Sequence, residues 1–179
     1  REFDYVNVLD DLTGSADADG NAFDLSEYTF DVLEKFEYLS ETQNYHFAAD
    51  IEKDIHTEAD PLKIGEVLYN LIGNAVNYTG EDKLVRVELK RQGDGTARFS
   101  VSDTGKGIKP EEITTIWDRY YRSSQAHKRP VKGTGLGLSI VKTILEKHNF
   151  RFGVESTVGK GTTFYVVFPE CAPPSDTEK

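Results

Sequence analysis

The sequence contains almost no cysteine and no long apolar run. Among its 179 residues the single cysteine is Cys171, near the C-terminal end. One cysteine cannot form an internal disulfide, and no Cys/His spacing is typical of a zinc site. No apolar segment approaches about 18 residues, the length that a membrane-spanning helix requires. These absences exclude a disulfide scaffold, a structural zinc domain and a membrane span within this stretch of chain.

Basic residues are scarce relative to acidic ones. The chain has 31 aspartates and glutamates against 21 lysines and arginines, which gives a formal net charge of −10 at pH 7. A protein that follows a nucleic-acid backbone presents a basic face to the phosphates, so we expect no nucleic-acid partner. A small phosphate ligand is not excluded, because a local basic cluster and oriented backbone N–H groups can hold one on an acidic protein.

Apolar periodicity predicts where the helices lie. Residues 1–12 have the pattern of the end of an amphipathic helix, and 13–21 have the composition of a linker. Four further helices are expected: from Ser26, as the N-cap, to Leu39; from Asp60-Pro61 to about Tyr78; over Glu111–Tyr121; and over Leu138–His148. The start at Asp60-Pro61 is the clearest, because it combines a capping carboxylate with proline at the first helical position.

Alternating apolar residues and glycine turns predict the strands. They are expected at His46–Ile51, Leu84–Arg91, Ala97–Ser102, Phe152–Ser156 and Thr162–Phe168. Glycine-containing turns at 92–95 and 159–161 predict that the last four of these form two hairpins. From Pro169 onward we expect a mobile tail. Helices and antiparallel strands without a regular βαβ alternation indicate an α+β fold, with one sheet covered by helices on one face.

The helix that starts at Asp60-Pro61 has an unusual polar face. Glu66, Asn70, Asn74 and Asn77 are spaced by four, four and three residues, so they lie on one side of the helix. Asparagine is a mediocre helix former, and a plain solvated face more often uses Lys, Glu and Gln. Amide oxygens can ligate a hard cation such as Mg²⁺. This face therefore favours a polar binding site over a solvated surface.

Two glycine-rich segments follow. Asp103 ends a predicted strand and precedes Gly105 and Gly107, which suits either close approach to a planar ligand or a plain turn. The segment 133–137 is a glycine-rich loop that opens a helix, where unpaired N–H groups can bind an anion. Five basic residues and no acidic one lie between Arg119 and Gly137. In an acidic chain, this clustering predicts a site for a polyanion such as a triphosphate, although a solvated basic loop would have the same composition.

These features, in this order, resemble the motif set of the sensor histidine kinases of two-component systems, which are grouped with DNA gyrase B, MutL and the heat-shock ATPase chaperones. The matching segments are Glu66-x-x-x-Asn70-Leu-x-x-Asn74-Ala-x-Asn77-Tyr78-Thr79 (asparagine box), Asp103-x-Gly105-x-Gly107-Ile108 (first glycine box), Trp117-Asp118-Arg119-Tyr120-Tyr121-Arg122 (aromatic box) and Gly133-Thr134-Gly135-Leu136-Gly137-Leu138 (second glycine box). A match to one box alone is weak evidence for the family, but a match to all four, in order and at the family's spacing, is specific.

The resemblance implies a Bergerat-type fold: a two-layer α/β sandwich with a mixed, mainly antiparallel sheet, helices on one face, and bound ATP and Mg²⁺. It implies that Asn74 ligates Mg²⁺ with Asn70 beside it, that Glu66 positions or activates the attacking group, and that Arg122 reaches the γ-phosphate. The remaining nucleotide contacts that it implies are Asn77, Tyr78, Asp103, Gly105, Gly107, Ile108, Tyr121, Lys132, Gly133, Thr134, Gly135, Leu136, Gly137, Leu138 and Thr162. Among these, Asp103 would accept the adenine amine, with help from Thr162 through water.

The resemblance also implies domains and partners. Residues 1–21 would be a remnant of a dimerisation helix with its linker, 22–169 the ATP-binding kinase domain and 170–179 a flexible tail. No histidine has the family's phosphoacceptor context, so we expect the acceptor on dimerisation helices outside this chain. The isolated domain is expected to be monomeric, to serve a response regulator, and to work in the cytoplasm as part of a parent anchored in the bacterial cell membrane.

Two departures and two alternatives bear on this interpretation. Asn77 stands where the family usually has Lys or Arg, which removes a phosphate contact that Lys132 or Arg129 would have to replace. Asn149 stands near a turn where glycine is usual, and asparagine tolerates the left-handed backbone that such a turn needs.

The alternatives are an ATPase clamp domain or sigma-factor-inhibiting serine kinase of the same superfamily, and a degenerate domain that only senses nucleotide or binds a partner. The arginines of the aromatic box favour the histidine kinase.

Overall fold

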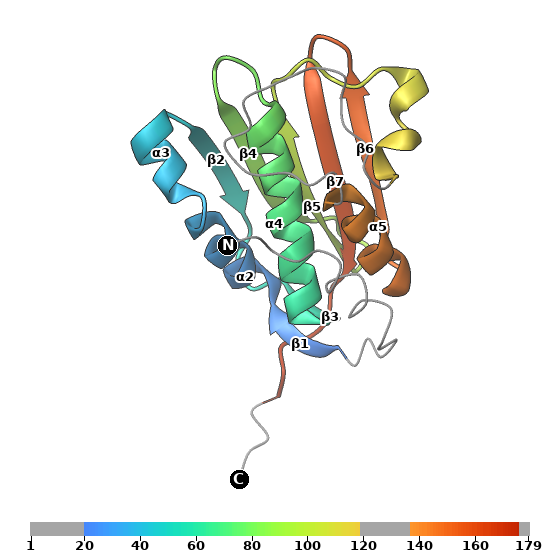
Figure 1. Ribbon diagram of the computed structural model, residues 1–179. Helices are drawn as coiled ribbons and strands as arrows, with labels where there is room; N and C mark the ends of the chain where they lie inside the picture. The colour runs from blue at the N-terminus through green and yellow to red at the C-terminus, as the bar shows by residue number, and fades with distance from the viewer. Residues whose placement is uncertain (1–19, 119–136, 176–179) are drawn as a thin grey trace.

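The computed structural model describes residues 20–118 and 137–175, and its main feature is a five-stranded sheet with helices on one face (Figure 1). The strand order is β2-β4-β5-β7-β6. The strands are β2 (His46–Ile51), β4 (Leu84–Arg91), β5 (Thr96–Asp103), β6 (Arg151–Thr157) and β7 (Gly161–Pro169). Only the pair of β2 with β4 is parallel, and the other three pairs are antiparallel. The predicted two-layer, mainly antiparallel α/β fold and both predicted hairpins are confirmed.

Four α-helices and two short 3-10 helices make up the helical part of the described residues. They are α2 (Leu25–Glu34), α3 (Glu37–Gln43), α4 (Pro61–Tyr78), α5 (Gly137–Lys147), η1 (Pro110–Glu112) and η2 (Thr115–Trp117). The central helix α4 lies across the sheet and packs against both α2 and α5 (Figure 1). None of the described helices is long and apolar enough to cross a membrane.

The core lies between α4 and the sheet. Val85, Val87 and Leu89 alternate along β4 and are fully buried, as their spacing predicts. On α4 the side opposite the asparagines carries the predicted apolar residues, each at most 1% exposed: Ile64, Leu68, Leu71, Ile72 and Ala75. Because this side faces the core, the helix is fixed in rotation, and Glu66 and the asparagines are left only half-buried on the other side.

The ends of α4 are as predicted. Asp60 is the N-cap, and its carboxylate accepts the backbone N–H groups of Leu62 (3.0 Å) and Lys63 (3.4 Å), while Pro61 occupies the first helical position. The helix runs to Tyr78. The turn after α5 also behaves as expected, because Asn149 has φ 57° and takes the left-handed conformation usually supplied by glycine.

The predicted helix from Ser26 to Leu39 is wrong in two respects. Asp24 is the N-cap, since its carboxylate accepts the N–H of Glu27 at 2.9 Å. Ser26 lies inside α2, buried, where its hydroxyl donates to Glu52 O (2.5 Å) and accepts from Ile55 N (3.1 Å). The helix also breaks after Glu34, and α3 continues the apolar stripe from Glu37. A serine that can cap a helix can equally bond a neighbouring loop, and only the tertiary contact decides.

The predicted helix over Glu111–Tyr121 is also wrong. Residues 110–118 form two separate 3-10 turns, η1 and η2, and residues 119–121 lie outside the described part of the chain. Ile113 and Thr114 stand between the turns and Thr115 begins η2. All three are β-branched, and β-branched residues lose rotamer freedom in a helix. The segment is anchored by buried Ile116 and by Trp117, whose ring packs edge-on against Phe152 at 5.2 Å.

A two-stranded sheet of β1 (Asn21–Asp24) and β3 (His56–Ala59) was not predicted as a pair of strands. It lies at one end of the molecule and is joined to the end of β7 (Figure 1). Thr57 donates its hydroxyl to Pro169 O at 2.8 Å, and Cys171 N donates to His56 O at 2.9 Å. The chain just after Pro169 is therefore held against the domain, so the predicted mobile tail does not begin before Cys171.

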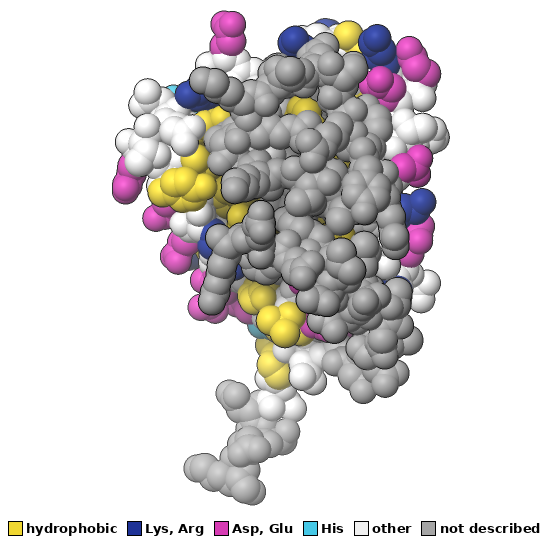
Figure 2. Space-filling model, in the orientation of Figure 1, with side chains coloured by type: hydrophobic (Ala, Val, Ile, Leu, Met, Phe, Trp, Pro, Cys, Tyr) yellow, Lys and Arg dark blue, Asp and Glu magenta, His cyan; other side chains and the backbone are white. Residues whose placement is uncertain are grey.

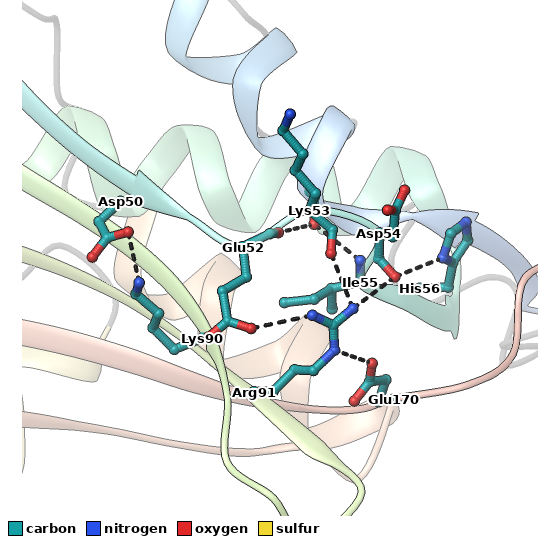
Figure 3. A network of polar contacts seen from close by, with 10 residues as sticks. Asp50, Glu52, Lys53, Asp54, Ile55, His56, Lys90, Arg91 and Glu170 are labelled. Atoms are coloured by element: carbon teal, nitrogen blue, oxygen red, sulfur yellow. Dashed lines mark hydrogen bonds and ion pairs between the residues drawn. The ribbon is translucent and has the colours of Figure 1, made fainter.

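Arg91 reinforces this junction (Figure 3). Its guanidinium donates to the carboxylates of Glu170 (2.7 Å) and Glu52 (3.1 Å) and to the carbonyl oxygens of Lys53 (3.0 Å) and Asp54 (3.1 Å). One side chain thus joins the end of β4, the loop between β2 and β3, and the C-terminal segment.

The described surface seen in Figure 2 carries acidic side chains around most of its edge, with basic side chains scattered between them. This distribution agrees with the net charge of −10. The expected helix over 1–12 and the basic segment 119–136 lie outside the described residues, as does the linker predicted over 13–21 up to residue 19. The end of that predicted linker is wrong, because Asn21 already begins β1.

Candidate functional site

The polar face of α4 contributes Glu66, Asn70, Asn74 and Asn77, all half-buried. Asn70 donates its Nδ2 to the carbonyl oxygen of Glu66 at 2.8 Å, so its Oδ1 remains an acceptor. That Oδ1 faces the first residue of α5, because a Cβ on Gly137 would lie 3.0 Å from it. The structure therefore brings the asparagine face of α4 next to the start of α5.

Asp103 is the last residue of β5 and is only 7% exposed. Burial raises the pKa of its carboxyl from the ordinary 3.8 to about 6, and hydrogen bonds from the backbone N–H groups of Gly105 and Thr162 oppose this rise. The Gly105 N–H donates to Oδ1 at 2.8 Å. Among residues 20–118 and 137–175, no lysine, arginine or histidine forms an ion pair with this carboxylate. Its acceptor capacity is therefore not consumed by a cation of the described chain.

The first glycine loop, residues 104–108, is clamped from two sides. A Cβ on Gly105 would come within 1.8 Å of Tyr78 O, so the loop lies directly on the C-terminal end of α4. Gly107 has φ 76°, and a Cβ there would come within 2.4 Å of Thr157 O. These two positions require glycine, the first for space and the second for conformation as well. The loop is thereby fixed between α4 and the turn that joins β6 to β7.

Thr162 pairs with Asp103 across the β5–β7 ladder. Its hydroxyl lies 2.9 Å from Ser156 Oγ, which itself donates to Gly161 O at 2.9 Å and accepts from Ile108 N at 2.8 Å. Because the single proton of Ser156 is used on Gly161, Thr162 is the donor of the pair, and its own oxygen is left to accept. Ser156 thus joins Ile108 to Thr162, which pairs with Asp103 in the neighbouring strand.

Several predicted site residues cannot be located. Gly137 and Leu138 begin α5, whereas Tyr121, Arg122, Lys132, Gly133, Thr134, Gly135 and Leu136 lie outside the described residues. The proposed replacements for the missing basic residue at Asn77, Lys132 and Arg129, lie outside them too.

Other residues of the site were missed from the sequence. Thr79, Asp82 and Thr104 form a hydrogen-bonded group beside Asp103, and Gly161 passes so close to it that a Cβ would lie 2.0 Å from Asp103 O. Threonine and aspartate are common in ordinary turns, so their types gave no reason to single them out. Only their position within or just after two matched motifs was a signal.

The donor set for a metal is sparse. The described residues contain no group of three or more His, Cys, Asp or Glu side chains that could hold a metal ion. Mg²⁺ commonly keeps several waters and takes most of its remaining ligands from substrate phosphates, so one or two amide oxygens can complete its shell. The amides of Asn70 and Asn74, on one half-buried helix face, fit that requirement only when a phosphate ligand is present.

Comparison with known proteins agrees with this geometry. The family model described as histidine kinase-, DNA gyrase B- and HSP90-like ATPase matches residues 59–172. The sensor protein kinase WalK of Staphylococcus aureus (strain MRSA252) is 38% identical over 130 residues, which is 72% of this chain and 21% of WalK. The circadian input-output histidine kinase CikA of Synechococcus elongatus is 32% identical over 174 residues, which is 93% of this chain and 23% of CikA. The chain therefore spans less than a quarter of either relative.

Solved structures give the same result. The nucleotide-free catalytic domain of histidine kinase ThkA superposes with a TM-score of 0.73 at 28% identity, covering 84% of this chain and 95% of that one. ThkA in complex with the response regulator protein TrrA superposes with a TM-score of 0.72 at 26% identity, covering 93% of this chain and 46% of that one. By its fold, its motifs and these matches, the chain belongs to the family of histidine kinase-, DNA gyrase B- and HSP90-like ATPases, in which its relatives are sensor histidine kinases.

Proposed function

We propose that this domain binds Mg-ATP and transfers the γ-phosphoryl group to a histidine on separate dimerisation helices. The observation that carries the proposal is the buried Asp103 carboxylate, which lies beside two glycine-containing turns and has no cationic partner among the described residues. The backbone N–H groups of Gly105 and Thr162 offset only part of the cost of burying this carboxylate, because its pKa is still raised to about 6. The exocyclic amine of adenine would be a further donor, and the Thr162 hydroxyl beside it can hold a bridging water.

The phosphates would lie along the α4 asparagine face. In this proposal Asn74 ligates Mg²⁺, Asn70 supports it from its position against Gly137, and Glu66 orients the attacking imidazole. Bound Mg²⁺ would neutralise charge on the phosphates. Tyr78 would pack beside the nucleoside, and Arg122, in the basic segment of the sequence, would reach the γ-phosphate. Transfer forms a phosphorus–nitrogen bond to the histidine as the bond to the ADP oxygen breaks.

The partners follow from this reaction. The phosphoryl acceptor is a histidine on the parent's own dimerisation helices, and the receiving protein is a response regulator. The solved complex of ThkA with its response regulator supports such a partner for a relative of this domain. In this proposal the domain works in the cytoplasm as part of a membrane-anchored parent, as expected from the resemblance to sensor kinases.

Calorimetric titration with ADP and with a non-hydrolysable ATP analogue tests nucleotide binding. We expect micromolar binding that strengthens with Mg²⁺, and we expect Asn74→Ala to remove the magnesium dependence while leaving ADP affinity without metal nearly unchanged. Trp117, the single tryptophan, provides an independent fluorescence readout. If the wild-type domain bound no nucleotide, the proposal would fail and the degenerate domain would be the remaining interpretation.

Phosphoryl transfer needs a second experiment. The domain is mixed with the parent's dimerisation helices and labelled ATP, and the product is tested for acid and base stability. Acid-labile, base-stable phosphate on the helices supports the histidine kinase. Release of inorganic phosphate alone, or acid-stable phosphate on serine, would instead identify a clamp ATPase or a serine kinase.

A further inference from the structure

Two short hydrogen-bond chains join the first glycine loop to the end of α4. In one, Thr104 N donates to Thr79 Oγ1 (3.4 Å), which donates to Leu84 O (2.6 Å). In the other, Gly80 N donates to Thr104 Oγ1 (3.4 Å), which donates to the Asp82 carboxylate. The same carboxylate accepts the N–H of Leu84 at 3.1 Å. Thr104 therefore takes part in both chains, once through its backbone and once through its side chain.

The direction of these bonds is fixed by the number of protons. Each threonine hydroxyl has one proton, and these are used on Leu84 O and on Asp82. The contact of 3.1 Å between the two hydroxyl oxygens therefore adds no third bond. The Thr104 hydroxyl holds the pKa of Asp82 below its ordinary value, with a smaller effect from the Leu84 N–H, so Asp82 is an ionised acceptor at neutral pH. Hydrogen bonds to a charged acceptor are stronger than neutral ones.

The position of Thr104 couples these hydrogen bonds to the Asp103 carboxylate. It lies between Asp103, the proposed adenine acceptor, and Gly105, whose N–H holds Asp103 Oδ1 at 2.8 Å. Gly105 in turn rests on Tyr78 O without room for a Cβ. A shift of residue 104 away from α4 would lift Gly105 off Tyr78 and remove the N–H that orients the carboxylate.

We propose that Thr104 is a positioning residue for nucleotide binding: its hydroxyl, held by Asp82, fixes the first glycine loop on α4 and thereby orients the Asp103 carboxylate toward the adenine amine. This inference rests on the proposed function, because it assigns a role to Thr104 only if Asp103 binds the base. It adds Asp82, which lies outside the matched motifs, to the residues that determine adenine affinity.

The test compares Thr104→Val, which keeps the shape and removes the hydroxyl, with Thr104→Ser, which keeps the hydroxyl. ADP affinity is measured calorimetrically between pH 5 and 8. We expect Thr104→Val and Asp82→Asn to weaken ADP by about tenfold, the scale of one lost hydrogen bond to a charged group, and Thr104→Ser to bind nearly as wild type. The pH below which ADP affinity falls should also move upward in Thr104→Val, because a misplaced Gly105 N–H stabilises ionised Asp103 less. A residue that only supports folding would not move this pH.

Thr163→Val is the matched control. The Thr163 hydroxyl also pairs with another hydroxyl, that of Ser102 at 2.7 Å, and its β7 neighbour Thr162 points to the other face of the sheet. This control should bind ADP as wild type. The inference is overturned if Thr104→Val binds ADP with wild-type affinity and pH profile, or if Thr104→Ser is as weak as Thr104→Val. If Thr104→Val fails to fold, the ADP affinity and pH profile of Asp82→Asn decide instead. A wild-type domain that binds no ADP would instead refute the proposed function.

Discussion

Asp103 is a residue whose buried environment disfavours its ionised form. The folded domain holds its carboxyl at a pKa of about 6 instead of 3.8, so the folded state binds a proton more readily than the unfolded chain does. The stabilisation from that proton is fully present below about pH 3.8 and is lost as the pH rises through about 6. At neutral pH the ionised, buried group costs about 2–3 kcal/mol. A group kept at such a cost is a candidate for function.

The first prediction concerns Asp103→Asn. We expect ADP affinity to fall by about 100-fold or more, because the amide cannot serve as a charged acceptor for the adenine amine. Without ligand, the melting temperature at pH 8 should stay the same or rise, because the buried charge is gone. Calorimetric titration and thermal unfolding measure the two effects. A large loss of stability without ligand would assign Asp103 to the fold and not to the site.

The second prediction concerns the titration of Asp103. The carboxyl carbon signal in NMR should titrate near pH 6 in the free domain and at clearly lower pH with ADP bound, because an amine donor favours the ionised form. A midpoint that ADP leaves unchanged would show that no donor reaches this carboxylate.

Residues of the site differ in how far the sequence predicts them. Asp103 and the glycines belong to motifs in which residue type and spacing carry the information. The hydrogen bond between Thr104 and Asp82 joins residues 22 positions apart in the chain. It forms because the pairing of β4 with β5 places the start of one strand beside the end of the other. No local pattern contains that information.

At the scale of secondary-structure elements, α4 was fully predictable and α2 was not. The start of α4 combines a capping aspartate with proline, and its apolar and polar faces are both distinct. In the region 24–43 Ser26 was predicted as the cap, but Asp24 caps α2, and two helices share the apolar stripe that predicted one. The strands β1 and β3 have only four residues each and pair across more than 30 residues, so they lack an alternation long enough to detect.

The third prediction tests the start of α4. Asp60→Ala removes the acceptor of two backbone N–H groups and should lower the free energy of unfolding by about 1 kcal/mol, whereas Asp60→Ser should retain most of it. Urea unfolding measures both variants. Equal stability of Asp60→Ala and wild type would mean that the cap contributes nothing to α4.

At the scale of the whole molecule, distant segments are joined by side chains that no motif predicted. Arg91 links the end of β4, the β2–β3 loop and the C-terminal segment through four hydrogen bonds (Figure 3). Its neighbour Lys90 makes one exposed ion pair, with Asp50. The motif order and the pattern of helices and strands predicted the class of ligand and the fold, but neither contains information about such long-range links.

The fourth prediction compares these neighbours. Arg91→Ala should lower the melting temperature measurably, because it releases the β2–β3 loop and the C-terminal segment together. Lys90→Ala should have little effect, as expected for an isolated surface ion pair. Thermal unfolding in low and high salt measures both. Equal effects of the two substitutions would contradict the role of Arg91 as a link between segments.

The central claim is that a magnesium-bound triphosphate nucleotide lies between the α4 asparagine face and the two glycine loops. A crystal structure of the domain with Mg²⁺ and a non-hydrolysable ATP analogue tests it most directly. The account predicts the adenine amine within hydrogen-bond distance of the Asp103 carboxylate and Mg²⁺ at about 2.1 Å from an amide oxygen of α4. A nucleotide bound elsewhere, with Asp103 contacting only protein, would contradict it.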